Sequence, residues 1–365
     1  MELIDIIACT TCGKCRVLCP VFEQTFWESM SPRGKVMLSY GLEIGELKSK
    51  DVLDSIYKCT NCKNCEEFCS SNVKILDIIL NVRRKIFDKH KPHGKEMENI
   101  LNYNNPFGEK KEKREEFYIP RNGKGKRILY IGCVPSYQDM KMVQSAMKLL
   151  DKFNIDYITL GKEETCCGYI AYLAGCEKVF RNCIGKNLEI FEKKNAKEII
   201  TICAGCYRTL KKIYKEYENM QNYEIFHISE YLALLMSSKK FSKVNGKVLY
   251  HDPCDLGRHM SIYEAPREVL SNIANLDEFK YNRKEAKCCG GGGGLKSFNI
   301  ELSRKIAINR VLEANERKAD IIATSCPACK SNLRFASKMV NKNIRVMDIC
   351  EVLCMGMKGI CYSNI

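Results

Sequence analysis

Cysteine is the residue whose spacing carries the most chemical information in this sequence. The chain has 365 residues and 23 cysteines, of which 18 fall into four groups. Two groups near the N-terminus are quartets with the spacing C-x2-C-x2-C-x3-C, and two later groups, called pentads below, have five cysteines each. Thiolate sulfur is a soft ligand that suits zinc and iron–sulfur clusters. The four groups therefore indicate metal sites.

The two quartets have the spacing of bacterial ferredoxins, and the first is followed by Pro20. In that arrangement three closely spaced thiolates hold one cubane cluster, while the fourth thiolate holds the neighbouring cluster. Zinc also accepts four thiolates, but the repeated spacing favours clusters. We therefore predict two [4Fe–4S] cubanes, one on Cys9, Cys12, Cys15 and Cys69, and one on Cys59, Cys62, Cys65 and Cys19.

Each pentad has one sulfur more than an ordinary site needs, because zinc and cubane clusters take four protein ligands. The fifth sulfur indicates a bridging thiolate or a cluster of another shape. A redox-active Cys-x-x-Cys pair of the thioredoxin type is an alternative, but it leaves the adjacent double cysteines unexplained. The first pentad is Cys133, Cys166, Cys167, Cys203 and Cys206, and the second is Cys254, Cys288, Cys289, Cys326 and Cys329.

The segments that carry the pentads form an internal repeat with an offset of 121 to 123 residues. In each copy a short apolar strand leads to a cysteine, and a later strand leads to a Cys-x-x-Cys pair that opens a helix. Strands that alternate with helices predict two α/β units, packed about a pseudo-twofold axis. In such a fold the cysteines at the strand ends converge in the crevice where ligands bind.

The predicted fold class is α+β, with an α-helical ferredoxin domain followed by two repeated α/β domains. The ferredoxin domain is expected at residues 1–95, where Ser31 and Pro32 start a helix. A polar surface linker is expected at 96–126, followed by the α/β domains at 127–243 and 244–365.

Several other residues are candidates for contact with a substrate. Gly290, Gly291 and Gly292 belong to a run of five glycines after Cys289, which would let backbone approach a cluster and leave open space, or would form a flexible loop. His251 and His259 flank Cys254 and could donate a proton or simply pack. An anionic substrate could be anchored by Arg258, Lys287 and Arg181. The remaining cysteines are expected in the core: Cys176, Cys183, Cys350, Cys354 and Cys361.

Composition excludes several other classes of protein. The chain is too long, and its cysteine content too low, for a secreted disulfide framework, and it has neither a secretion signal nor an apolar run of transmembrane length. A cytoplasmic location is expected. The net charge of +15 suits an anionic substrate or partner, since no nucleic-acid-binding motif accompanies it. No flavin or nicotinamide fingerprint is present, so the electrons are expected to come from a partner protein.

The pentad spacing resembles the cysteine-rich CCG domain. Two such domains behind two ferredoxin quartets resemble the D-type subunit of heterodisulfide reductase, or a fusion of that enzyme's cytoplasmic C and B subunits. The resemblance covers nearly the whole chain and includes Pro32-Arg33-Gly34, Asn105-Pro106-Phe107-Gly108 and the segment from His251 to Arg258. It implies a noncubane [4Fe–4S] cluster in one or both pentads.

The resemblance also implies a function in methanogenesis, with the disulfide of coenzyme M and coenzyme B bound between two clusters and split by two electrons. The electron donor would be a flavoprotein, a hydrogenase-linked protein or a cytochrome b, and the last would place the chain beside a membrane. Asp255 stands where relatives often have histidine. As an alternative, the architecture also resembles the iron–sulfur subunits of glycolate, lactate and glycerol-3-phosphate oxidases, which pass on electrons from a flavoprotein.

Overall fold

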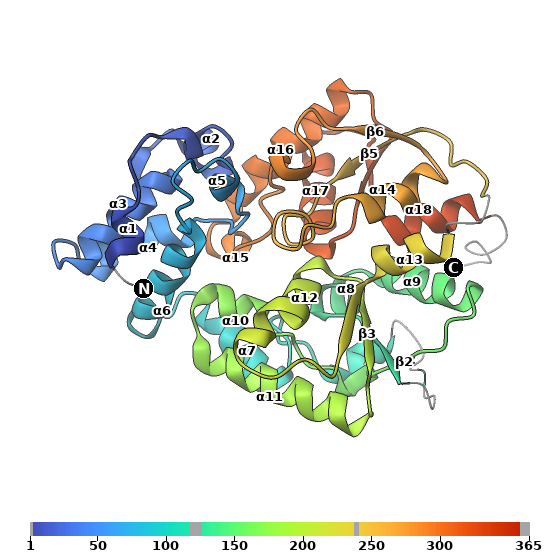
Figure 1. Cartoon of the computed structure of the whole chain (residues 1–365). Helices are drawn as coiled ribbons and strands as arrows, with labels where there is room; N and C mark the ends of the chain where they lie inside the picture. Colours follow the sequence, from blue (N-terminus) through green and yellow to red (C-terminus); the bar gives the residue numbers. More distant parts are fainter. Residues whose placement is uncertain (1–2, 117–120, 122–125, 237–240, 358–365) are drawn as a thin grey trace.

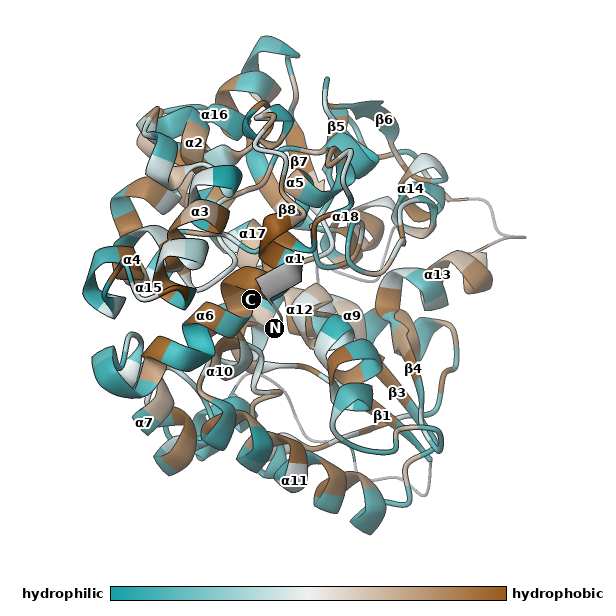
Figure 2. Ribbon diagram, turned by 60° about the vertical axis from the view of Figure 1, so that its left-hand side comes forward, coloured by the Kyte–Doolittle hydropathy of each residue, from teal (hydrophilic) through white to brown (hydrophobic). Residues whose placement is uncertain are grey.

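The computed structural model describes residues 3–116, 121, 126–236 and 241–357. Three parts follow one another along the chain: a helical domain and two α/β units (Figure 1). The strands are mostly hydrophobic, whereas the outer helices carry many hydrophilic residues (Figure 2). None of the helices in the described ranges is both long and apolar enough to cross a membrane.

The helical domain contains both quartets. Ser31 caps helix α3 by accepting a hydrogen bond from the Gly34 amide, and Pro32 is the first helical residue, as predicted. Val36, Ile56 and Ile79 lie in the core between the helices. The elements are α1 (Leu3–Ile7), η1 (Lys14–Arg16), α2 (Pro20–Thr25), η2 (Glu28–Met30), α3 (Pro32–Glu43), α4 (Ser49–Tyr57), α5 (Asn64–Glu67) and α6 (Ile75–His90).

The segment expected as a surface linker at 96–126 differs from that expectation in its described part. Helix α7 (Gly94–Tyr103) extends into it, and η3 (Lys111–Glu116) follows. Arg114 in η3 is fully buried against the first α/β unit. The polar sequence suggested a surface linker, but the burial and pairing of Arg114 anchor this segment to the first unit.

The first α/β unit contains a four-stranded parallel sheet in the order β2-β1-β3-β4. Both faces of the sheet are buried, as is usual for parallel sheets. Its elements are β1 (Arg127–Tyr130), α8 (Cys133–Gln138), α9 (Met140–Lys152), β2 (Ile158–Thr159), η4 (Gly161–Glu163), α10 (Tyr169–Ala174), α11 (Glu177–Lys193), β3 (Glu198–Thr201), α12 (Ala204–Arg208), η5 (Thr209–Ile213), η6 (Tyr214–Glu216), β4 (Glu224–His227) and α13 (Ile228–Met236).

The second unit repeats this topology with the sheet order β6-β5-β7-β8, also parallel. The repeat predicted from the sequence is therefore a repeat of structure. The elements are β5 (Lys247–His251), α14 (Glu264–Ser271), β6 (Asn275–Glu278), η7 (Arg283–Glu285), α15 (Leu295–Phe298), α16 (Ile300–Glu316), β7 (Ile321–Thr324), α17 (Pro327–Met339), β8 (Arg345–Asp348) and α18 (Ile349–Gly356).

The two units share one hydrophobic core, which includes Leu129 of the first sheet and Tyr250 of the second. Helix α9 contacts α18, and α13 contacts α14 (Figure 1). Helices α9 and α14 follow the first strand of their units, and α13 and α18 close them, so the two contacts are reciprocal. This is the packing that a pseudo-twofold axis produces.

The topology explains why the pentad cysteines converge. In each sheet the chain leaves the first strand toward one edge and the third strand toward the other, so a crevice opens between the carboxyl ends of these neighbours. Cys133 and Cys203 follow β1 and β3 in the first unit, and Cys254 and Cys326 follow β5 and β7 in the second. The strands therefore deliver cysteines from distant parts of the sequence to one point.

Candidate metal centres

The first hollow in the helical domain is lined by Cys9, Cys12, Cys15 and Cys69. Cys69, the last cysteine of the second quartet, thus lies with the first three cysteines of the first. The Val73 amide donates to the Cys69 sulfur at 3.3 Å, an N–H···S bond of the kind that stabilises a thiolate. Burial raises the pKa of the Cys15 thiol.

Several residues in and around the first quartet are exposed. Cys12 is exposed, whereas the other cysteines of the quartets and pentads, all within the described residues, are at least partly buried. Ile7, Val17, Phe26 and Trp27 are 59 to 78% exposed. Glu28, the neighbour of Trp27, pairs with Arg33, which lines the hollow.

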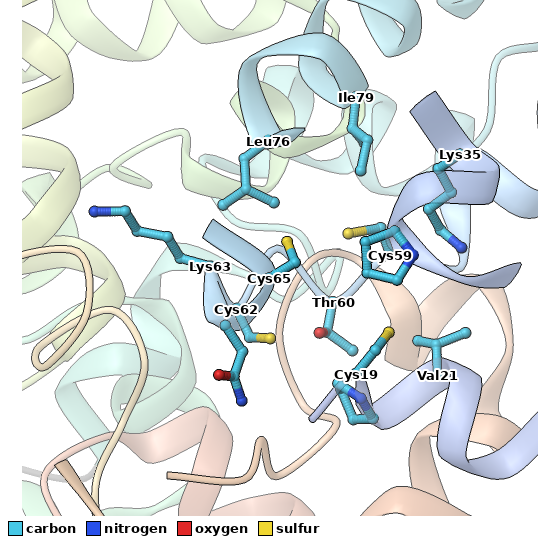
Figure 3. Close-up of a pocket in the computed structure, with 13 residues that line it drawn as sticks. Cys19, Val21, Lys35, Cys59, Thr60, Cys62, Lys63, Cys65, Leu76 and Ile79 are labelled. Carbon is cyan, nitrogen blue, oxygen red and sulfur yellow. The ribbon is translucent and has the colours of Figure 1, made fainter. Parts of the chain in front are cut away.

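The second hollow is lined by Cys19, Cys59, Cys62 and Cys65, whose sulfurs surround one space (Figure 3). Here the last cysteine of the first quartet joins three of the second. The two hollows are of similar size. The Asn61 amide donates to the Cys59 sulfur at 3.4 Å, and burial raises the pKa of Cys19 to about 12.

Two cations are buried beside the second hollow. Lys35 on α3 lines it (Figure 3). Arg83 on α6 donates to the Cys59 carbonyl at 2.9 Å. Burial lowers the pKa of both groups, and the nearby Cys59 sulfur opposes this shift.

The five sulfurs of the first pentad form a chain of contacting side chains. Cys167 accepts hydrogen bonds from the thiols of Cys166 and Cys206, and these donors hold its pKa well below the usual range. The chain continues from Cys166 to Cys133 and from Cys206 to Cys203. Gly132, with φ of +86°, lies close to Cys206, where a Cβ would be 3.0 Å from the sulfur. Cys183, expected as a core residue, is buried and touches Cys166.

The second pentad has the same chain in the same order. Cys289 lies between Cys288 and Cys329, with its sulfur 3.2 Å from that of Cys329, and its hydrogen bonds with these two neighbours lower the Cys289 pKa well below its usual range. Cys288 continues to Cys254, and Cys329 continues to Cys326. His251 lies beside this pentad, with a ring nitrogen and the sulfurs of Cys289 and Cys329 all within 4.8 Å of one another. Burial lowers the His251 pKa to about 3.

The second hollow and the second pentad are in direct contact. Cys62 of the hollow is hydrogen-bonded to Cys288 of the pentad. Arg258 reinforces the contact by donating from Nε to the Cys62 carbonyl at 2.6 Å, and the His259 ring bonds the Asn61 carbonyl at 2.8 Å. Arg258 and His259 thus bind the ferredoxin loop, and their roles toward a substrate stay a prediction.

Part of the glycine run also packs against this loop. A Cβ on Gly293 would lie 2.4 Å from the Cys59 carbonyl oxygen, and one on Gly292 would lie 3.4 Å from that of Thr60. A Cβ on Gly291 would meet the Ala328 carbonyl at 2.9 Å, and one on Gly290 that of Ser303 at 2.6 Å. The absence of side chains therefore lets the second pentad approach the ferredoxin domain.

The two remaining anchor candidates also have protein partners. Lys287 pairs with Glu23 of α2, and Arg181 is an exposed side chain paired with Glu177 on its own helix. The structure thus places Lys287 at the domain boundary and Arg181 on the surface.

Three residues near the junction of the pentads are not apparent from the cysteine pattern. The Tyr169 hydroxyl donates to Asp255 at 2.6 Å, and Arg208 bonds both Tyr169 and Asp255. Each lies one or two residues beyond a pentad cysteine. This cluster ties the cysteine loops of the two units together, and proximity to the pentads in the sequence is the signal that could have identified it.

The donor sets fit iron–sulfur clusters. Each hollow offers four sulfurs around one space, each pentad offers five contacting sulfurs, and backbone amides point at several of them. The amide of Gly168 lies 3.3 Å from Cys166, and that of Gly290 lies 3.3 Å from Cys288.

Comparison with known proteins agrees with this division of the chain. Residues 5–73 match the 4Fe-4S dicluster domain, and residues 128–211 and 248–334 each match the cysteine-rich domain. The D-type subunit of the dihydromethanophenazine:CoB–CoM heterodisulfide reductase of Methanosarcina barkeri is 29% identical, with 97% of this chain and 94% of that protein aligned. The EtfAB:quinone oxidoreductase of Syntrophomonas wolfei is 28% identical over 98% of this chain and 59% of that protein.

A solved structure shares the fold. The crystal structure of a hypothetical protein from Helicobacter pylori has a TM-score of 0.64 at 13% identity, and the match covers 93% of this chain and 70% of that one.

Proposed function

Because the chain belongs to the family of iron–sulfur proteins in which a dicluster domain precedes two cysteine-rich domains, and which includes the D-type subunit of heterodisulfide reductase, we propose that it reduces a disulfide at its second pentad. Its role as an iron–sulfur electron-transfer subunit follows from the homology. The proposal adds the substrate class, an anionic disulfide such as that of coenzymes M and B, and the place of the reaction.

One observation supports the second pentad above all others: the contact between Cys62 and Cys288. It gives electrons from the ferredoxin domain a direct route to that pentad. We propose the cubane ligands to be the cysteines of the two hollows and the noncubane ligands to be the five sulfurs of each pentad.

Cleaving a disulfide consumes two electrons and two protons and yields two thiols. When bound, the cubanes would carry single electrons, and clusters at the pentads would collect the pair that the reaction needs. Arg258 and His259 hold the two sites together, and the glycine run keeps side chains out of the contact. The cluster of Tyr169, Arg208 and Asp255 fixes the cysteine loops of the two units relative to each other.

The test is reduction of the coenzyme heterodisulfide by the iron-loaded chain with a reduced viologen as donor. Cys289→Ser should abolish turnover and the thiol-dependent paramagnetic signal while leaving the cubanes reducible. Cys350→Ser is the matched control, because Cys350 is equally buried but lies outside the pentads. Turnover retained by Cys289→Ser would refute the assignment.

Cys62→Ser separates electron supply from chemistry. Since Cys62 contacts Cys288, this change should interrupt delivery from the ferredoxin domain while the pentad signal persists. Equal loss of the pentad signal would contradict the separation.

A second candidate function is electron transfer from a flavoprotein, with no substrate of its own. The similarity to the EtfAB:quinone oxidoreductase favours it. In that case the chain would co-purify with a flavin dehydrogenase, and thiols would leave the pentad signals unchanged. Under either function we propose that a partner subunit supplies the electrons, because the sequence has no flavin or nicotinamide motif.

A further inference from the structure

We propose that Lys35 and Arg83 direct electron flow through the ferredoxin domain by making a cubane in the second hollow easier to reduce than one in the first. The inference rests on the proposed cubane ligands, and it holds for either candidate function because it does not depend on the final acceptor.

Lys35 is the first of the two cations. Its side chain is 2% exposed and lines the hollow together with Cys19 and Cys59. Its Nζ donates to the Met30 carbonyl at 2.6 Å. Among the described residues, no carboxylate lies close enough to form an ion pair with the Lys35 Nζ, which requires 4.0 Å or less. The charge is therefore buried beside the sulfurs without a protein counter-ion.

Arg83 is the second cation, and it is fully buried. Its guanidinium donates to carbonyl oxygens from three parts of the chain: Ile56 and Cys59 in the ferredoxin domain, Leu173 in the first unit and Gly293 in the second. The guanidinium also lies over the aromatic ring of Tyr57. Carbonyl oxygens satisfy the N–H groups but leave the positive charge uncancelled.

Acidic groups near the second hollow do not offset both cations. Glu66 lies next to Cys65, and its carboxylate accepts from the Leu76 amide at 2.8 Å. Burial raises the pKa of Glu66. Arg258 adds a third buried cation over the Cys62 carbonyl, so positive charge dominates on this side.

The first hollow has a different electrostatic environment. Its arginine, Arg33, pairs with Glu28, and both side chains are partly open to solvent. Lys14, which also lines it, is exposed. A neutralised or solvated cation acts weakly on a nearby charge, whereas a buried and unpaired one acts strongly.

The consequence for reduction follows from charge. Adding an electron makes a thiolate-ligated cluster more negative, and a buried cation stabilises that state more than the oxidised one. The second cubane should therefore accept electrons from the first. Since the first lies under exposed Cys12 and the second contacts the second pentad, the flow is inward.

The experiment is a redox titration of the iron-loaded full chain, followed by electron paramagnetic resonance, with Cys62→Ser used to assign the second cubane's signal. In Lys35→Met the ratio of oxidised to reduced second cubane should rise at least about tenfold at fixed potential, which is about 59 mV for one electron. The first cubane's midpoint should stay unchanged. Lys35→Arg should keep the native value because it keeps the charge.

Arg33→Met is the matched control at the first hollow, where the pairing with Glu28 predicts a shift several times smaller. Arg83→Lys, which keeps the charge but loses most carbonyl contacts, should retain the potential better than Arg83→Met. If Arg83→Met fails to fold, the shift in Lys35→Met alone decides whether a buried cation sets the potential of the second cubane.

Two results would overturn the inference and can be told apart. If both cubane signals are present and Lys35→Met shifts neither, or shifts both equally, the role of the cations is wrong while the proposed function stands. If no cubane signal appears in the iron-loaded chain, the proposed cofactors fail, and this inference fails with them.

Discussion

Arg114 and Glu164 form an ion pair inside the first unit, and their side chains are only 1% and 0% exposed. Glu164 also accepts the amides of Ile131 and Gly132, which lead into Cys133. Arg114 bonds Tyr137 and Ser136 and reaches the Cys133 sulfur at 3.7 Å. The pair therefore supports the loop that carries the first cysteine of the pentad.

Replacing Arg114 by Leu should destabilise the protein by about 3–5 kcal/mol, because the Glu164 carboxylate would be left buried and unpaired. The measurement is the melting temperature of the iron-loaded chain. Arg181→Leu is the control, since its pair with Glu177 is exposed and worth about 0–1 kcal/mol. Equal melting temperatures for the two variants would contradict this account.

Single residues also show where sequence reasoning succeeds and where it stops. The pentads and the exchange of Cys19 and Cys69 between hollows follow from spacing, because spacing reflects which elements carry each cysteine. Arg114 lies in the segment predicted as a polar surface linker, and its burial was not predictable because pairing with a distant residue leaves no local pattern. The Tyr169, Arg208 and Asp255 cluster is likewise a long-range contact.

Among the elements, the glycine run and the ferredoxin loop fit together closely. Gly293 has φ of +68°, a left-handed conformation, and its backbone lies against Cys59 and Thr60. The repeated strands and helices were predictable from the repeated sequence. The contact between the glycine run and the ferredoxin loop was not predictable. Five glycines indicate that side chains are excluded, but they do not identify the segment that lies against them.

Gly293→Ala should separate the second pentad from the second hollow. The left-handed backbone costs about 1–2 kcal/mol, and the new Cβ would lie 2.4 Å from the Cys59 carbonyl, so the loops must move apart. We expect slower reduction of the pentad by the cubanes in rapid-mixing experiments, together with a lower melting temperature.

The control for this prediction is Gly185→Ala in helix α11, where nothing lies within 4 Å of the new Cβ. That change should stabilise the protein by roughly 0.5–1 kcal/mol and leave electron transfer unaltered. A pentad reduced at the native rate in Gly293→Ala would show that the glycine is not needed for the contact.

For the whole molecule, the junction of the ferredoxin domain and the second unit should be sensitive to acid. His93 is buried there against Tyr57 and Phe298, and its Nδ1 lies 3.0 Å from the Ser297 hydroxyl. Burial lowers the His93 pKa from 6.5 to about 4, with Glu96 opposing the shift and Arg83 reinforcing it. Between pH 4 and 6.5 the His93 ring is therefore neutral in the native state, whereas it is protonated in the unfolded chain.

The sign of the effect follows from that difference. The stabilisation is complete above the unfolded pKa of 6.5 and is lost as the pH falls toward 4, by about 1.4 kcal/mol per pH unit. His93→Gln, which does not titrate, should flatten this part of the dependence of melting temperature on pH. An unchanged slope in the variant would assign the acid sensitivity to other groups.

Trp27 is the only tryptophan in the sequence; it is exposed and precedes Glu28, whose partner Arg33 lines the first hollow. The molecule thus contains a single tryptophan, which can be excited at wavelengths that its 18 tyrosines do not absorb. Iron–sulfur clusters absorb in the range where tryptophan emits, so loading the first site should quench the emission. Cys12→Ser should preserve the fluorescence, and loading of the second site alone should change it less. Emission that ignores the first site would contradict this arrangement, whereas quenching would let assembly be timed without an added label.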